Sequence, residues 1–142
     1  MTSVNQLLQN KGFDILSVDA NETVFRALEI MAEHGIGSLL VMDGEKVAGL
    51  FSERDYARGI ILKGRTSKET KVKEIMTSQV VVVTPEQSIE ECMAIMTEKR
   101  VRHLPVMKDD KLVGIISIGD LVKAIIEEQQ FMIEQLVSYI NR

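Results

Sequence analysis

A serine followed three residues later by an aspartate occurs twice in this chain. Gly49-x-x-Ser52-x-x-Asp55 recurs 65 residues later as Gly114-x-x-Ser117-x-x-Asp120, each time where a predicted strand passes into a predicted helix. The first amides of a helix suit a phosphate, and the serine hydroxyl is a further donor. A carboxylate would repel that phosphate, so we assign the aspartates to paired ribose hydroxyls. Serine with aspartate therefore predicts a nucleotide site.

The same motif has a structural explanation, which a single copy would favour. Ser52 can cap its helix while Asp55, at the third helical position, returns a hydrogen bond. Three features weaken this alternative: the glycine before each serine, the hairpin strand that leads into it, and the retention of both aspartates although neighbouring residues differ. Both explanations stay open from the residues alone.

The repeat extends well beyond the motif. At the same offset Val18 pairs with Val83 and Met31 with Met96, so nearly a whole unit is duplicated. Each repeat has about 45 residues, too few to bury a good core alone, and we expect the two to pack as one body. Apolar residues make up 45% and charged residues 27% of the 142 residues, which is typical of a folded, soluble chain.

Charge and composition exclude several classes of function. The formal net charge is −4 with no cluster of Lys and Arg, which argues against nucleic acid as the main partner. The single cysteine, Cys92, lies on a predicted buried stripe, where core packing is favoured over metal or nucleophilic chemistry. Neither a signal peptide nor an apolar run of about 18 residues is present, so we expect no membrane contact and a cytoplasmic location.

Each repeat is predicted to open with a strand and a helix. Ile15–Val18 and Val80–Val83 are apolar runs typical of strands buried on both faces. Asp19 and Thr84 are suitable N-caps, and Pro85 and Gln87 would complete the second helix start. The apolar residues that follow at helical spacing are Val24, Ala27, Leu28 and Met31, and then Ile89, Cys92, Met93 and Met96.

A hairpin and a second helix complete each repeat. Strands over 39–42 and 47–51 flank Asp43-Gly44, and strands over 104–107 and 112–116 flank Asp109-Asp110. Ser52 and Ser117 then begin helices. Each repeat is thus β-α-β-β-α, so the expected class is α/β of the α+β kind, with an N-terminal helix and a long C-terminal helix.

The expected boundaries follow the repeat. We place the first repeat and its lead-in helix at residues 4–62, a polar linker at 63–73, the second repeat at 74–126 and a helical extension at 127–142. The last helix is predicted to continue to about Ile140. Its apolar side is expected either to pack on its own domain or to mediate self-association.

The chain resembles a tandem pair of cystathionine-β-synthase (CBS) domains, the arrangement called a Bateman module. The resemblance covers about residues 4–126 and rests on the two Gly-x-x-Ser-x-x-Asp motifs, on His103-Leu104-Pro105-Val106, and on Val72-Lys73-Glu74-Ile75-Met76-Thr77. It implies pseudo-twofold packing of the repeats, clefts between them that take adenine nucleotides without catalysis or metal, and a homodimer.

The resemblance also implies which residues hold the ligand. Backbone at the first two strands would hold the adenine, the aspartate the ribose, and the serine the ribose or phosphate. These positions are Val18, Gly37, Ser38, Leu39, Ser52 and Asp55 in the first repeat, and Val82, Thr84, Arg102, His103, Leu104, Pro105, Ser117 and Asp120 in the second.

The two copies differ where specificity would be set. Arg54 becomes Gly119, whereas Gly35 and Gly37 become Arg100 and Arg102, and His103 replaces Ser38. If the clefts lie between the repeats, Arg54, Arg100, Arg102 and His103 converge on one phosphate group. The alternatives are a solvated charged face for the arginines and a structural role for His103, while His34 is expected at the surface. We predict one tight site and one weaker site.

Three classes of function follow from these observations. The leading one is a non-catalytic regulatory module that binds AMP, with NAD(H) or ATP as other candidates, and signals to an effector protein. A small nucleotide-acting enzyme is disfavoured, because the sequence has no phosphate-binding Gly-rich loop, metal-ligand cluster or nucleophile at a meaningful distance from histidine. A ligand-free dimerisation module would leave both motifs as helix caps.

Overall fold

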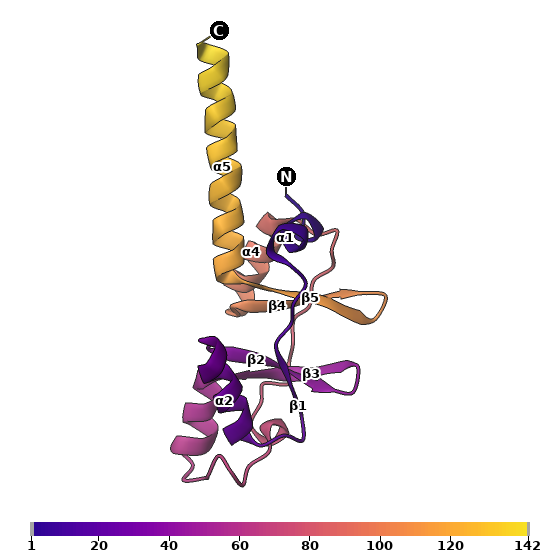
Figure 1. Ribbon diagram of the computed structural model, residues 1–142, viewed down its shortest axis with the longest axis vertical. Coiled ribbons are helices and arrows are strands. Elements are labelled where there is room, and N and C mark those ends of the chain that lie inside the picture. Colours follow the sequence, from indigo (N-terminus) through magenta and orange to yellow (C-terminus); the bar gives the residue numbers. More distant parts are fainter. Residues whose placement is uncertain (1, 142) are drawn as a thin grey trace. The chain divides into compact units, whose positions relative to one another are not determined.

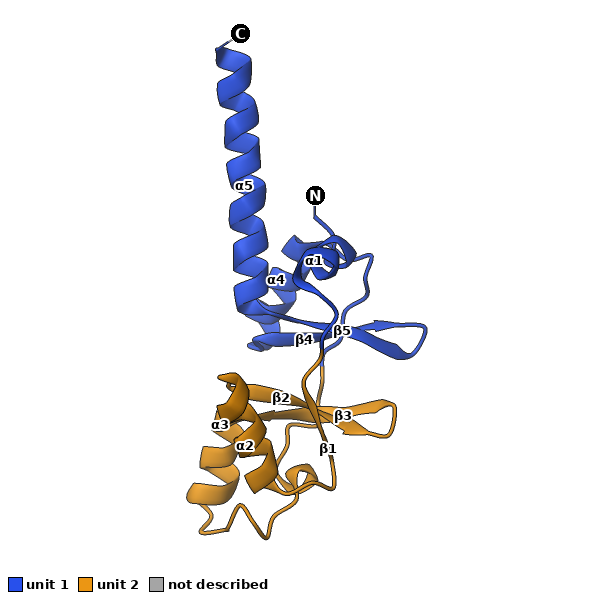
Figure 2. Ribbon diagram, viewed as in Figure 1, with its two compact units in different colours: residues 1–14, 81–142 blue, residues 15–80 orange. Residues whose placement is uncertain are grey.

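The segment that leads into each repeat packs on the other repeat. In the computed structural model, which describes residues 2–141, helix α1 (Val4–Lys11) belongs to unit 1, formed by Met1–Asp14 and Val81–Arg142 (Figure 2). Unit 2 is Ile15–Val80 and contains the 3₁₀ turn η2 (Val72–Glu74). The boundaries 4–62, 63–73, 74–126 and 127–142 stay predictions for the repeats as stretches of sequence, and the packing units cut across them.

The fold is mixed α+β, with two small sheets and five α-helices among the described residues (Figure 1). In unit 2 the strand order is β1-β2-β3, with β1 parallel to β2 and β2 antiparallel to β3. The further elements of unit 2 are β1 (Ser17–Asp19), α2 (Val24–His34), β2 (Ser38–Asp43), β3 (Lys46–Ser52), α3 (Glu53–Tyr56) and the π-helical turn η1 (Ala57–Ile61).

Unit 1 repeats this plan with a two-stranded sheet. Its further elements are α4 (Ile89–Lys99), β4 (His103–Lys108), β5 (Lys111–Ser117) and α5 (Ile118–Ile140). The β4-β5 hairpin has the register of β2-β3, including a bulge at the equivalent place. Asp109 and Asp110 form its turn with φ of 51° and 63°, the left-handed values that a tight hairpin turn requires. Both predicted hairpins are confirmed.

The strand predicted at Val80–Val83 is wrong in its extent. Only Val83 pairs with β4: its N–H donates to the Pro105 carbonyl (3.0 Å) and its carbonyl accepts from Met107 (2.9 Å). The chain just before it is held in unit 2, where Thr77 pairs with Leu50, so it cannot extend the ladder in unit 1. Burial on both faces is also wrong, since Val82 is 46% exposed.

The predicted starts of the first helix of each repeat are wrong by four residues. Asp19 and Thr84 begin turns, and the N-caps of α2 and α4 are Thr23 and Ser88. The reason is tertiary: the predicted linker supplies acceptors for the start of α2, and the Thr2 carbonyl accepts from the Ile89 amide (3.0 Å) at the start of α4. The amide of Val24 donates to the Thr70 carbonyl (2.9 Å), and Thr70 is itself buried. The linker therefore packs as part of unit 2.

The predicted apolar stripes of α2 and α4 are confirmed. Val24, Ala27 and Met31 are buried in unit 2, as are Ile89, Cys92 and Met96 in unit 1. Burial, with a smaller effect of Glu91, raises the pKa of the Cys92 thiol to about 11. The thiol is therefore protonated and serves packing, as expected.

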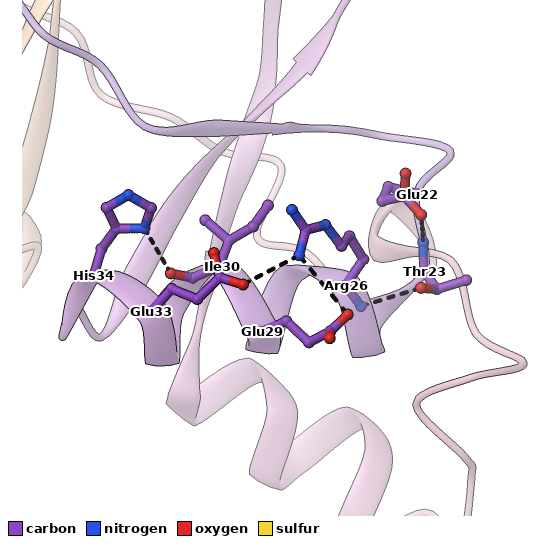
Figure 3. A network of polar contacts seen from close by, with 7 residues as sticks. All are labelled: Glu22, Thr23, Arg26, Glu29, Ile30, Glu33 and His34. Carbon is purple, nitrogen blue, oxygen red and sulfur yellow. Dashed lines mark hydrogen bonds and ion pairs between the residues drawn. The ribbon is translucent and has the colours of Figure 1, made fainter.

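Polar side chains cover the outer face of α2 (Figure 3). Arg26 lies 3.5 Å from Glu33 and 3.8 Å from Glu29, and His34 Nδ1 lies 3.0 Å from the Ile30 carbonyl oxygen. His34 is exposed, as predicted. Exposed ion pairs of this kind contribute little to stability.

Candidate functional site

The motif of the first repeat forms a capping box at the end of β3. The Ser52 hydroxyl oxygen accepts from the Asp55 amide (3.2 Å), and Asp55 Oδ2 accepts from the Ser52 amide (2.9 Å) and hydroxyl (3.1 Å). The structural explanation of the motif is therefore confirmed in its geometry. It leaves the other carboxylate oxygen, Oδ1, directed at a further partner.

The motif of the second repeat has the same geometry at the end of β5. The Ser117 amide donates to Asp120 Oδ2 (2.8 Å), and the Asp120 amide donates to the Ser117 hydroxyl oxygen (3.1 Å). Both aspartates are thus held in one orientation by the backbone that precedes them. A carboxylate fixed in this way can accept hydrogen bonds without losing side-chain freedom on binding.

The glycine of each motif is required by the close approach of a lead-in segment. A Cβ atom at Gly49 would lie 2.5 Å from the Thr77 carbonyl oxygen and 2.9 Å from Met76 Sδ. A Cβ atom at Gly114 would lie 2.8 Å from Leu8 Cδ2. The glycine that both copies share is therefore explained by packing against the lead-in segments.

The lead-in segments also supply a further partner for each aspartate, and these partners differ. Thr77 Oγ1 donates to Asp55 Oδ1 (3.0 Å), whereas Lys11 Nζ lies 2.7 Å from Asp120 Oδ2 and also donates to the Ile115 carbonyl. Sequence reasoning missed both contacts. Lys11 gave no signal, because α1 was assigned to the repeat that follows it.

Part of each helix start is already used within its own unit. The Glu53 amide donates to the Gly37 carbonyl (3.1 Å), and the Ile118 amide donates to the Arg102 carbonyl (2.9 Å). Together with the amides bound by the serines, these bonds occupy two of the donors that we had assigned to phosphate. The geometry therefore supports the carboxylates as ligand groups more strongly than the helix amides.

The other predicted binding residues lie near the motifs in differing environments. In β2 and β4, Ser38 and His103 stand opposite Ser52 and Ser117. Arg100 ends α4 with φ of 56°, where Gly35 ends α2 with φ of 62°. Among the predicted residues the structure buries Val18, Leu39, Leu104 and Pro105 and exposes Gly37, Arg54, Val82, Thr84, Arg100 and Arg102.

Arg54 belongs to unit 2, whereas Arg100, Arg102 and His103 belong to unit 1. Their convergence on one phosphate group stays a prediction. Within unit 1, the three residues lie between the end of α4 and the start of β4.

The charges around the second motif shift two pKa values. Burial lowers the pKa of His103, and Lys11 and Arg102 lower it further against the opposing effect of Asp120. Burial alone would raise the pKa of Asp120, but hydrogen bonds from Lys11 and Ser117 together hold that pKa below its ordinary value. His103 is therefore neutral and Asp120 ionised near neutral pH.

We expect the stability of unit 1 to fall as the pH drops below the ordinary histidine pKa of about 6.5. Below that pH the unfolded chain binds a proton at His103 that the folded chain does not bind, so acid favours unfolding. The free energy of unfolding then falls by at most about 1.4 kcal/mol per pH unit, until the pH reaches the lowered pKa of the folded state. Urea denaturation between pH 7.5 and 5.5 measures the slope.

His103→Gln should reduce this slope. His34→Gln, at an exposed position, should retain the wild-type slope and serves as the matched control. Equal slopes in the two variants would remove His103 as the source of the acid sensitivity.

Comparison with known proteins finds the same two repeats. The model of the CBS domain matches residues 10–61 and 72–127, one stretch for each repeat. The chain belongs to the CBS-domain family. CBS-domain proteins are generally regulatory or ligand-binding modules and commonly oligomerise.

Three relatives illustrate the family. A putative signal-transduction protein with CBS domains from Burkholderia ambifaria is 53% identical, with a TM-score of 0.85 over 90% of this chain and 96% of its own. The mitochondrial CBS domain-containing protein CBSX3 of Arabidopsis thaliana is 38% identical over 99% of this chain and 72% of its own. A hexameric CBS-CP12 protein from bloom-forming cyanobacteria is 26% identical, with a TM-score of 0.72 over 84% of this chain and 66% of its own.

No described helix is both long and apolar enough to cross a membrane. No group of three or more His, Cys, Asp or Glu side chains in the described part could hold a metal ion.

Proposed function

We propose that this protein is a regulatory module that binds an adenine nucleotide through its two Ser-x-x-Asp motifs and carries out no reaction. The observation that supports the proposal most is the matched orientation of Asp55 and Asp120, each held by a capping box at a strand end. Such fixed carboxylates suit paired ribose hydroxyls. AMP is the first candidate ligand, and NAD(H) and ATP are the others.

The two motifs should bind ribose unequally. At Asp55 a ribose hydroxyl competes with the neutral Thr77 hydroxyl, whereas at Asp120 it competes with the Lys11 ammonium. Both contacts reach a carboxylate, but only the Lys11 ammonium adds the attraction of a full opposite charge, so it is the harder partner for a ribose hydroxyl to displace. We therefore assign the tighter of the two predicted sites to the first motif and the weaker one to the second.

The proposed output is a change in the assembly of the chain or in its contact with an effector protein. The Burkholderia relative is described as a putative signal-transduction protein, which agrees with this role. A ligand that binds one conformation better than another shifts the population toward that conformation. We propose a homodimer as the form that responds.

The ligand-free alternative has structural support of its own. Serine and aspartate cap the helices, and the glycines admit the lead-in segments, so each shared residue of the motif has a packing or capping role. Ligand binding must therefore be measured directly.

We expect an adenine nucleotide to raise the melting temperature of the protein. At a concentration of 100 times Kd, a ligand that binds only the folded state stabilises it by about 2.7 kcal/mol. Differential scanning fluorimetry with AMP, ATP, NAD, NADH and S-adenosylmethionine, with guanosine monophosphate as the control base, measures the shift. Stability unchanged by all of the adenine compounds would contradict the proposal, and turnover of a stabilising ligand would favour the enzyme alternative.

A further inference from the structure

The second half of α5 extends beyond the core of unit 1 (Figure 1). Leu121 is fully buried near the start of the helix, and the Thr2 hydroxyl donates to Glu128 (2.9 Å) about halfway along it. Every residue from Gln129 to Ile140 is exposed. This half lies outside the matched CBS domains, which end at residue 127. The exposed residues of this half therefore belong to neither CBS repeat and do not pack in the core of unit 1.

Apolar residues on this half follow a regular spacing. Ile126, Ile133 and Ile140 recur every seven residues, and Gln129 and Leu136 stand between them at alternating steps of three and four. We name these five residues the tail stripe. The four apolar members are between 52% and 76% exposed. Steps of three and four are the spacing of a coiled-coil seam, and this seam is about 21 Å long.

We propose that the tail stripe is a dimerisation seam that pairs in parallel with the same helix of a second copy. The tail stripe is complementary to itself, which favours a second copy of the chain as its partner. Isoleucine occupies the first seam position three times and Leu136 the second, the combination that favours two parallel strands, and Gln129 is the single polar member of the seam. In a parallel pair, Gln129 meets Gln129 of the second copy.

The charged residues of α5 are compatible with pairing to a second copy of the same helix. Glu127 and Glu134 lie on the side turned away from the tail stripe, so pairing does not bring them together. A helix that lies on an anionic membrane instead carries Lys and Arg on its polar face. The acidic polar face of α5 therefore disfavours a lipid surface. The seam is independent of the proposed nucleotide.

The test uses two glutamate substitutions at equally exposed apolar positions of one helix. Ile133 (59% exposed) lies on the tail stripe, and Phe131 (60% exposed) lies on the opposite side. We expect Ile133→Glu to raise the dimer dissociation constant at least tenfold in sedimentation equilibrium, while Phe131→Glu leaves it unchanged. Circular dichroism should show the same helix content in both variants.

A cysteine pair tests the parallel register. Gln129→Cys should form a disulfide between copies under mild oxidation, and Ser138→Cys, on the far side of the helix, should not. The native Cys92 is buried and does not interfere. A monomeric wild-type chain, or equal effects of Ile133→Glu and Phe131→Glu, would overturn the proposal. Dimers without the Gln129→Cys cross-link would overturn the parallel pairing.

Discussion

Leu8→Ala is expected to destabilise unit 1 by about 2–5 kcal/mol. Leu8 is 1% exposed in the core of unit 1, where its Cδ2 atom fills the space that a Cβ at Gly114 would enter. Helix α1 is held there by backbone bonds from Val4 to Gln87 (2.8 Å) and from Asn5 to Pro85 (2.9 Å), so it cannot easily shift to close the cavity. The loss should appear in urea denaturation.

The part of the chain that Leu8→Ala destabilises tests which repeat α1 packs on. Hydrogen exchange should show reduced protection in residues 81–126, and residues 15–80 should keep theirs, because α1 packs with the second repeat. Leu62→Ala makes the same chemical change at a 77% exposed leucine and should alter stability by less than about 0.5 kcal/mol. Reduced protection confined to residues 15–80 would show that the lead-in helix packs on the repeat that follows it.

Asp55→Ala and Asp120→Ala should each weaken one nucleotide site by about 10- to 100-fold, because a hydrogen bond to a charged group contributes about 1.5–3 kcal/mol. The loss should be larger for Asp55, which we assign to the tighter site. Both variants should remain folded, since a lost helix cap costs about 1 kcal/mol. Isothermal titration calorimetry with the ligand found by thermal melting resolves the two sites.

Ser88→Ala is the matched control for this experiment. It removes a helix-capping hydrogen bond, in which the Ser88 hydroxyl oxygen accepts from the Glu91 amide (3.1 Å), at a helix start outside both motifs. We expect the same loss of stability and no loss of binding. If the aspartate variants bind the nucleotide as well as Ser88→Ala does, the carboxylates serve only as caps.

Local signals determined much of this protein. The repeat at a constant offset of 65 residues, the turn residues of both hairpins and the Ser-x-x-Asp motifs predicted paired strands and capped helices that the structure contains. Helical spacing likewise predicted that Cys92 packs in a core and that the last helix continues to Ile140. These features succeeded because they depend on residues close in sequence, whose spacing fixes turns, caps and apolar faces.

Tertiary structure alone decided which segments pack together. The chain before each repeat lies against the other repeat, so Lys11 reaches Asp120 and Thr77 reaches Asp55, contacts that no local spacing could predict. The same packing places the N-cap of α2 at Thr23 instead of Asp19. The Val24 amide, at the first helical position, donates to the Thr70 carbonyl. Local sequence thus determined two similar motifs, and long-range packing made them electrostatically different by pairing Asp120 with the Lys11 ammonium and Asp55 with the neutral Thr77 hydroxyl.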